Sequence, residues 1–279
     1  MILFFLGIWS ILIEPNIIKV EKISIEIKAL PASFTGAKIA VLADLHSKYY
    51  GAREKKVLKI LKKLNPDFIF LAGDIVDWST KNLKSCQEFW KDLDRNYHNK
   101  IFAVYGNHEH LNPRFKTFNK LLRETEIEII NNQARKIEKN EEFIYLLGVD
   151  DPHLGYDDLS KAMEEIGSDD ASPKILLAHP PEIFRKVKTF NEEKIINKKI
   201  DLVLTGHTHG GQINIPFFVD FILPLNYDSH YKAGFFKENS TYLYVSRGIG
   251  NSGLPIRLNS FPEITLIKLE SNNTEIKKF

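Results

Sequence analysis

Aspartate, asparagine and histidine side chains occur in short clusters, and each cluster directly follows an apolar, strand-like run. The runs occupy residues 37–43, 67–72, 101–105, 174–178 and 201–205. The candidate metal ligands that follow them are Asp44, His46, Asp74, Asn107, His179, His207 and His209. Carboxylate, carboxamide and imidazole groups bind hard to borderline divalent metals, and neighbouring strand ends bring such groups together. The clusters therefore predict a site for two metal ions.

A pair of metal ions suits the hydrolysis of phosphate esters. The reaction needs positive charge near phosphorus, a hydroxide at neutral pH and a proton donor for the leaving oxygen, and two cations about 3.5–4 Å apart supply the first two. Two cations this close need a carboxylate that bridges them. In two clusters the ligands are two residues apart, so each pair can leave a strand end on the same side. These pairs are Asp44 with His46 and His207 with His209.

The chain around these clusters alternates strands with helices. Helical patterns over 52–64 and 83–93 separate the first three strand-like runs, which predicts an α/β sheet with buried parallel strands. Further along, the strands follow one another more closely, and the tail is mostly β, with strands expected over 212–215 and 262–270. We predict two mixed sheets packed face to face with helices outside, formed by one domain over residues 17–279.

The clusters resemble, in order, the motifs of the calcineurin-like metallophosphoesterases. The matching segments are DLH at 44–46, GDIVD at 73–77, GNHE at 106–109, LLAH at 176–179 and GHTHGGQ at 206–212. Residues 146–152 and 244–257 are similar to the bacterial branch that includes membrane-associated phosphodiesterases and a UDP-2,3-diacylglucosamine hydrolase of lipid A synthesis. The resemblance covers residues 37–269 and implies an α/β fold, a two-sheet αββα sandwich, with hydrolase activity on phosphate esters.

The resemblance also implies a role for each site residue. One metal ion would be held by Asp44, His46, Asp74 and His209. The second would be held by Asp74, Asn107, His179 and His207, with Asp74 as the bridge. His108 would donate a proton to the leaving group, oriented by Asp77 or another nearby carboxylate. The implied reaction is attack by a hydroxide shared between two divalent ions, with Mn²⁺ favoured and Fe, Zn or Co as alternatives.

Two further features bear on the substrate. Arg247 precedes a glycine-rich turn and is a candidate substrate-binding residue, because its guanidinium group could bind phosphate; a structural ion pair is an equal alternative. The stretch 215–225 is apolar and rich in phenylalanine, which is consistent with either core packing or a lipid-facing lip of the active site.

Residues 1–13 form an uninterrupted apolar segment. We assign residues 1–16 as a candidate membrane anchor with Trp9 near the interface. Packing of this segment on the protein itself and an atypical secretory signal are the alternatives. Lysines follow the segment and none precedes it, which favours the cytoplasmic side of a membrane for the catalytic domain.

The composition excludes few functions. Hydrophobic residues at 43% and charged residues at 27% are typical of a globular protein, and the net charge of +2 provides no basic track for nucleic acid. The only cysteine is Cys86, so no internal disulfide forms. The leading hypothesis is hydrolysis of a phosphodiester or a pyrophosphate-linked lipid or cell-envelope substrate. The alternatives are a UDP-2,3-diacylglucosamine diphosphatase, a non-catalytic scaffold and a nuclease; no oligomeric state is predicted.

Overall fold

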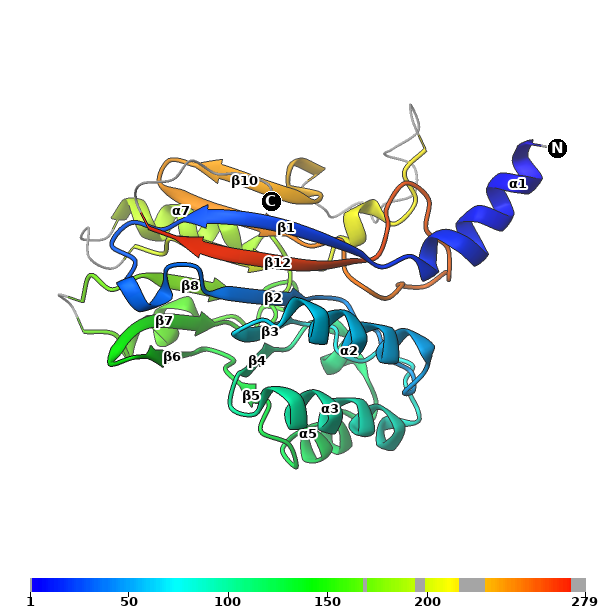
Figure 1. Cartoon of the computed structure of the whole chain (residues 1–279), viewed down its shortest axis with the longest axis horizontal. Helices are drawn as coiled ribbons and strands as arrows, with labels where there is room; N and C mark the ends of the chain where they lie inside the picture. Colours follow the sequence, from blue (N-terminus) through cyan, green and yellow to red (C-terminus); the bar gives the residue numbers. More distant parts are fainter. Residues whose placement is uncertain (1, 168–169, 194–198, 216–228, 272–279) are drawn as a thin grey trace.

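The computed structural model describes residues 2–167, 170–193, 199–215 and 229–271, and it contains two stacked β-sheets flanked by helices (Figure 1). The first six-stranded sheet has the order β1 (Lys19–Glu26), β12 (Glu263–Glu270), β2 (Lys38–Leu42), β3 (Phe68–Ala72), β4 (Ile101–Val104) and β5 (Glu128–Ile129). The second six-stranded sheet has the order β10 (Gly234–Glu238), β11 (Thr241–Val245), β9 (Leu202–Thr205), β8 (Lys174–Leu177), β7 (Glu142–Gly148) and β6 (Gln133–Lys139). The predicted two-sheet sandwich is confirmed.

Strand direction decides where the loops meet. Strands β2 to β5 are parallel, and so are β7, β8, β9 and β11. Strand β12 is antiparallel to β2 and parallel to β1, while β6 and β10 are antiparallel edges of the second sheet. The carboxyl ends of parallel strands share one edge of a sheet, which is the usual place for a binding site in such folds.

The hydrophobic core has three layers, because successive strand residues point to opposite faces. Between the sheets, Ile39, Val41 and Phe70 of the first sheet pack with Leu146 and Ile175 of the second. The outer face of the first sheet is covered by α2 (Ala52–Leu64), α3 (Leu83–Tyr97) and α5 (Phe115–Leu122). The outer face of the second sheet is covered by α6 (Leu159–Glu164) and α7 (Ile183–Glu193).

The chain departs from the predicted elements after β9. The strand expected over 212–215 is wrong: only one isolated bridge forms there, between Ile213 and Leu258. The backbone is left-handed at Gly210, Gly211 and Gln212, with φ of 58°, 79° and 48°, and such a run cannot enter a strand. Beyond Ile215, the predicted apolar lip lies outside the described residues. The remaining short helices are α4 (Asn107–Leu111), η3 (Ala32–Phe34), η5 (His209–Gly211) and η7 (Ser229–Tyr231).

The N-terminal segment is helical and extends from one end of the sandwich (Figure 1). It comprises α1 (Ile2–Ile8) and the short turns η1 (Trp9–Ile13) and η2 (Glu14–Asn16). Among the described residues, no helix combines the length and apolar character needed to cross a bilayer. The segment leaves the molecule beside the first residues of β1, at the end where β2 finishes.

Candidate metal centre

The predicted ligands come together at the carboxyl ends of the parallel strands. Asp44 and His46 follow β2, Asp74 follows β3, Asn107 begins α4 after β4, His179 follows β8, and His207 and His209 follow β9. Five of these side chains belong to buried residues, whereas Asn107 and His207 are half-buried. The two sheets therefore contribute to one shared site.

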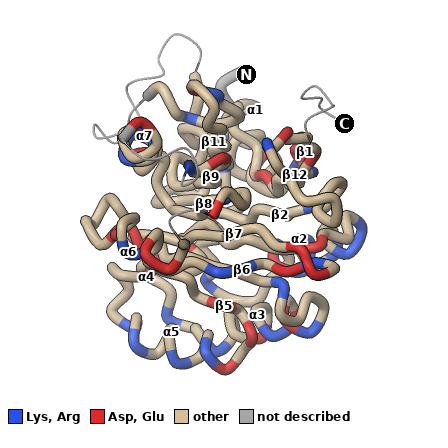
Figure 2. Tube along the Cα trace, turned by 90° about the vertical axis from the view of Figure 1, so that its left-hand side faces the viewer, with Lys and Arg blue, Asp and Glu red and all other residues tan. Residues whose placement is uncertain are grey.

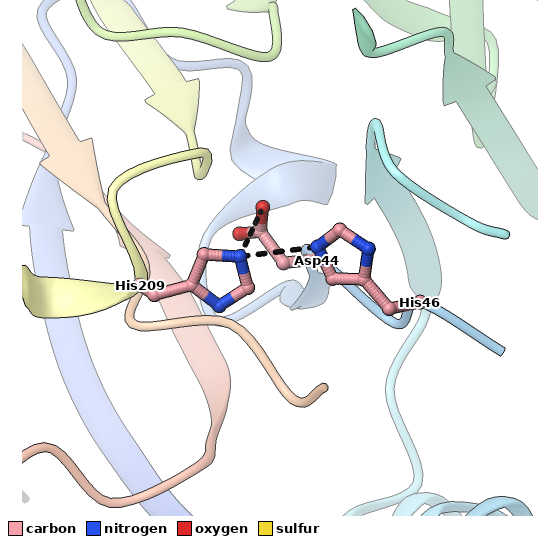
Figure 3. Close-up of side chains that lie close together, drawn as sticks. All are labelled: Asp44, His46 and His209. Atoms are coloured by element: carbon pink, nitrogen blue, oxygen red, sulfur yellow. Dashed lines mark hydrogen bonds and ion pairs between the residues drawn. The ribbon is translucent and has the colours of Figure 1, made fainter. Parts of the chain in front are cut away.

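The first group consists of Asp44, His46 and His209, whose side chains point toward one another in Figure 3. Nε2 of His46 lies 3.0 Å from Nε2 of His209, and the latter lies 3.6 Å from Oδ1 of Asp44. Two imidazole nitrogens and a carboxylate oxygen thus converge on one point. Burial, then the His46 imidazole and the Arg257 guanidinium, hold the pKa of His209 well below its usual value, so this imidazole is neutral, as metal binding requires.

The second group consists of Asp74, His179 and His207. Nε2 of His179 lies 3.2 Å from Oδ2 of Asp74 and 3.1 Å from Nδ1 of His207. The same Oδ2 of Asp74 lies 3.5 Å from Nε2 of His46 in the first group. Asp74 thus faces both groups with a single oxygen atom.

Electrostatics at the site favour a cation. Burial raises the pKa of Asp44 to about 6, because the negative charge is unfavourable away from water. A positive charge nearby would offset this cost. Burial also opposes charge on His179, but Asp74 and Asp44 together hold its pKa well above the usual value. Burial, followed by His179, lowers the pKa of His207.

One buried polar atom tests whether these residues fit a metal. Among the described side chains, Oδ1 of Asn107 is buried without a hydrogen-bond partner. A buried oxygen that accepts no hydrogen bond costs about 1–3 kcal/mol unless another ligand, such as a cation, takes its place. The Asn107 oxygen, together with two carboxylates and four imidazoles, is a donor set that suits divalent metals.

The backbone of the ligand loops is strained. Asp44, His46, Asp74, His207 and His209 all have positive φ, between 42° and 72°. Non-glycine residues seldom adopt this conformation, and it costs of order 1 kcal/mol each unless the surroundings enforce it. Side chains and backbone pack closely around these loops, as two glycines beside the ligands show.

Two glycines show how close the backbone approaches the ligands. A Cβ atom on Gly206 would lie 2.5 Å from Oδ2 of Asp44, and one on Gly106 would collide with Oδ1 of Asp74. Backbone hydrogen bonds then fix both carboxylates: the His207 amide donates to Asp44, and the His108 amide donates to Oδ1 of Asp74 at 2.9 Å. Only glycine leaves room for these contacts at 106 and 206.

His108 forms a third such group with His46 and Asp74, and its Nε2 lies 3.9 Å from Oδ2 of Asp74. Its Nδ1 accepts a hydrogen bond from the amide of Trp78 at 3.2 Å, so the neutral ring carries its proton on Nε2. Burial lowers the pKa of His108 to about 4. The carboxylate that we expected to orient this ring, Asp77, has Oδ2 at 3.7 Å from His108 Nδ1 and at 3.6 Å from Nδ1 of His46. Asp77 is therefore as close to the ring of His46 as to the ring of His108, and it can orient either of them.

Arg247 takes the structural alternative that the sequence left open. Its Nη1 donates to Oε2 of buried Glu263 at 2.7 Å, and the guanidinium is partly exposed. Burial opposes its charge, but Glu263 raises the pKa of Arg247 above the usual value. A role in substrate binding remains a prediction.

Glu109 is a site residue that the sequence reasoning did not assign. Its buried carboxylate accepts backbone hydrogen bonds from Gly106 at 2.8 Å, Val76 at 2.9 Å and Asp74 at 3.0 Å. Burial, then the Asp74 charge, raises the pKa of Glu109 to about 8. The signal was available: a glutamate at the third helical position, three residues after the glycine that caps the helix, is a capping-box pattern.

Arg257 is a second residue that sequence reasoning missed. It is fully buried, and its guanidinium donates to the carbonyls of Arg247, Gly248, Gly250 and Ser260. Its Nη2 lies 3.3 Å from Nδ1 of His209. No local pattern marks this arginine, because all of its partners except Ser260 lie more than five residues away in the chain.

Comparison with known proteins agrees with this geometry. The family model of the calcineurin-like phosphoesterases matches residues 37–211. A zebrafish (Danio rerio) transmembrane protein with metallophosphoesterase domain is 30% identical over 265 residues, covering 90% of this chain and 57% of its own length. The Escherichia coli phosphodiesterase YaeI is 29% identical over 239 residues, covering 83% of this chain and 82% of its own length.

The fold also has a counterpart among solved structures. TT1561 of Thermus thermophilus superposes with a TM-score of 0.50 at 15% identity, covering 77% of this chain and 91% of that one. At this identity the likeness shows the fold alone. The matched family model spans more than half of the chain and contains all five ligand clusters except the end of the last motif. The chain therefore belongs to the calcineurin-like phosphoesterases, metal-dependent hydrolases of phosphate esters.

Proposed function

We propose that the site holds two divalent metal ions and hydrolyses phosphodiesters or pyrophosphate-linked substrates. The observation that carries this proposal is the position of Asp74, whose Oδ2 lies 3.5 Å from His46 Nε2 and 3.2 Å from His179 Nε2. A carboxylate oxygen directed into two groups of imidazoles is the arrangement expected of a bridging ligand.

We assign four ligands to each ion. The first set is the group of Asp44, His46 and His209 together with Asp74, whose Oδ2 lies 3.5 Å from Nε2 of His46. The second set is the group of Asp74, His179 and His207 together with Asn107, whose Oδ1 is buried without a hydrogen-bond partner in the described part of the chain. Nitrogen and oxygen ligands without thiolate suit Mn²⁺, our first choice, as well as Fe, Zn or Co. When bound, these ions would supply positive charge at the phosphoryl group and an activated water.

His108 is the proposed proton donor to the leaving oxygen. Its Nε2–H faces the site because Nδ1 accepts the Trp78 amide. Burial lowers the pKa of His108, but an anionic phosphate ester beside the ring favours imidazolium, as do the carboxylates of Asp74 and Asp77. In the imidazolium form Nδ1 also carries a proton, so it gives up the Trp78 hydrogen bond and faces Oδ2 of Asp77, 3.7 Å away. The proton passes from Nε2 to the departing alkoxide as the ester bond breaks. Arg247, beside the site on the chain leaving β11, is a candidate to contact the phosphate with the part of its guanidinium that faces solvent.

The substrate that we favour is amphiphilic, a phosphodiester or pyrophosphate-linked lipid or cell-envelope component. Exposed apolar side chains on the N-terminal segment, such as Phe5 and Leu12, support a membrane location. Residues 1–16 serve as the anchor and residues 17–279 as the catalytic domain, with the lysines after the segment favouring the cytoplasmic side. Within this class, UDP-2,3-diacylglucosamine is one specific candidate.

A metal and substrate panel tests the proposal. Metal-depleted protein is restored with Mn²⁺, Fe²⁺, Zn²⁺ or Co²⁺ separately and assayed on a soluble monoester, a soluble diester and UDP-2,3-diacylglucosamine. We expect activity only after restoration, with the diester or the lipid cleaved faster than the monoester. Restoration by no cation would refute the metal centre, and much faster monoester cleavage would refute the substrate class.

Detergent phase partitioning tests the anchor separately. The full chain should enter the detergent phase, and a version that starts at Lys19 should stay in the aqueous phase. Identical partitioning of the two proteins would remove residues 1–16 from the anchor role.

A further inference from the structure

In the part of the chain that the structure describes, the large exposed hydrophobic side chains lie at one end of the molecule. Among the described residues they are Phe5, Leu6, Trp9, Ile11, Leu12, Ile13, Ile17, Tyr49, Trp78, Leu111, Tyr156, Ile215 and Leu254. Those up to Ile17 belong to the N-terminal segment and its junction with β1. The others lie in the segments that follow the ligand-bearing strands β2, β3, β4 and β9, with Leu111 at the end of α4, or on the loops after β7 and β11.

Figure 2 views the molecule from the opposite end and shows Lys and Arg lying among Asp and Glu along the chain. Single exposed hydrophobic residues are normal on any protein, but their collection at one end marks an interaction surface. The metal-ligand groups lie at the end of the molecule that carries these exposed hydrophobic side chains.

The rim of the site includes side chains around His108. Trp78, whose amide contacts the His108 ring, is 53% exposed, and Leu111 at the end of α4 is 55% exposed. Tyr156 is 54% exposed and packs against His110, with ring centroids 4.8 Å apart. His110 in turn contacts Asp150 at 2.7 Å, which ties the Tyr156 loop to α4. These side chains therefore present apolar surface beside His108 and the metal-ligand groups.

The N-terminal segment is fastened to the same end. The amide of Arg257 donates to the Ser10 carbonyl at 2.9 Å, and the amide of Ser260 donates to Oε1 of buried Glu14 at 2.6 Å. The Trp9 ring donates to Oε2 of Glu14 and packs edge-on against Phe261. The loop that receives the segment is the one whose Arg257 reaches His209.

Charge at the base of the segment is positive. Residues 2–13 contain no charged side chain, and the carboxylate of Glu14 is buried and already hydrogen-bonded. Lys19 lies over the Phe261 ring at 3.7 Å, and Lys56 donates to the Asn16 carbonyl at 2.7 Å. Apolar surface bordered by lysines complements an anionic bilayer, where tryptophan and tyrosine favour the interface and lysine favours the headgroups.

We infer that the catalytic end itself docks on an anionic lipid bilayer, with Tyr49, Trp78, Leu111 and Tyr156 as a second contact beside the N-terminal segment. The metal-ligand groups would then face the lipid headgroups, and an amphiphile could reach the site without leaving the membrane. This inference deepens the proposed function and depends on it only for the identity of the catalytic end.

Vesicle co-sedimentation of the full chain tests the inference without any substrate. The probes are vesicles of phosphatidylcholine mixed with phosphatidylglycerol, and vesicles of phosphatidylcholine alone. We expect Leu111→Ser with Tyr156→Ser to weaken binding to the mixed vesicles about tenfold, the scale of losing two interfacial hydrophobic contacts. The control is Glu88→Ser with Lys91→Ser on the outer face of α3, which preserves the net charge and should bind like the parent.

A fluorescence measurement locates the contact directly. In a Trp9→Phe background, Trp78 is the exposed tryptophan and Trp90 is buried, so a headgroup-labelled quencher lipid should quench Trp78 when vesicles bind. Unquenched Trp78 in fully bound protein would overturn the inference, as would unchanged binding of the rim variant. A dimer that this variant dissociates, without vesicle binding, would assign the surface to a second copy instead. Neither readout involves hydrolysis, so failure of the proposed function would be recognised separately.

Discussion

Removing the carboxylate of Glu109 should destabilise both the fold and the metal centre. This carboxylate accepts three backbone hydrogen bonds, from Gly106, Val76 and Asp74, at 2.8–3.0 Å, and it is completely buried. A buried donor left without its partner costs about 1–3 kcal/mol. Three such donors make Glu109→Ala about 3–9 kcal/mol less stable, a large part of the 5–15 kcal/mol that stabilises a typical domain.

The amide variant separates hydrogen bonding from charge. In Glu109→Gln the oxygen can still accept from Gly106 and Asp74, while the NH₂ group faces the Val76 amide, so one hydrogen bond is lost. With a pKa of about 8, Glu109 is mostly protonated at pH 7 in the metal-depleted protein, so the amide changes its charge little. We therefore expect the lost hydrogen bond to decide the result, with a net loss of about 1 kcal/mol.

Urea unfolding of the metal-depleted variants measures these differences, and calorimetric titration with Mn²⁺ measures the effect on the site. Glu54→Ala is the matched control, because Glu54 occupies the same position in α2 and accepts from the Gly51 amide at 2.9 Å without contacting a ligand carboxylate. It should lose stability but keep its metal affinity. Unfolding of Glu109→Ala within about 1 kcal/mol of the parent, with unchanged metal affinity, would refute the reasoning.

Other changes test single features of the site and the fold. Asp74→Asn should abolish metal binding and activity together, because it weakens the oxygen that faces both groups; calorimetry and turnover check this, and retained binding of two ions would contradict it. His108→Ala should keep its metal and lose about 10²–10⁴-fold in kcat, the usual contribution of a positioned acid; full activity would remove His108 from that role. Burial raises the pKa of Asp201 from 3.8 to about 6, so it stabilises the fold fully below pH 4 and progressively less as the pH rises through 6. Asp201→Asn should therefore be about 1–2 kcal/mol more stable than the parent at pH 7 and equal to it at pH 4, allowing for partial exposure; equal stability at both pH values would contradict the assignment.

Much of the fold followed from local patterns in the sequence. The apolar runs before Asp44, Asp74 and Asn107 are strands because continuous apolar sequence suits strands buried on both faces. The helix expected over 52–64 is α2 with the predicted bounds. The failed strand at 212–215 has the opposite cause, since three successive left-handed residues turn the chain away regardless of its apolar pattern.

The sequence by itself determined which side chains can bind metal and that they stand at strand ends, because residue type and short-range spacing are local properties. Only the tertiary structure decided how they are grouped: His46 meets His209 across 163 residues, and Asp74 meets His179 across 105. Other contacts also formed only in the folded chain. Asp77 lies between His46 and His108, and Glu109 accepts a hydrogen bond from the amide of Asp74. The N-terminal segment contacts the loop of Arg257. Such contacts depend on how the sheets stack and the loops close, and no spacing along the chain encodes that.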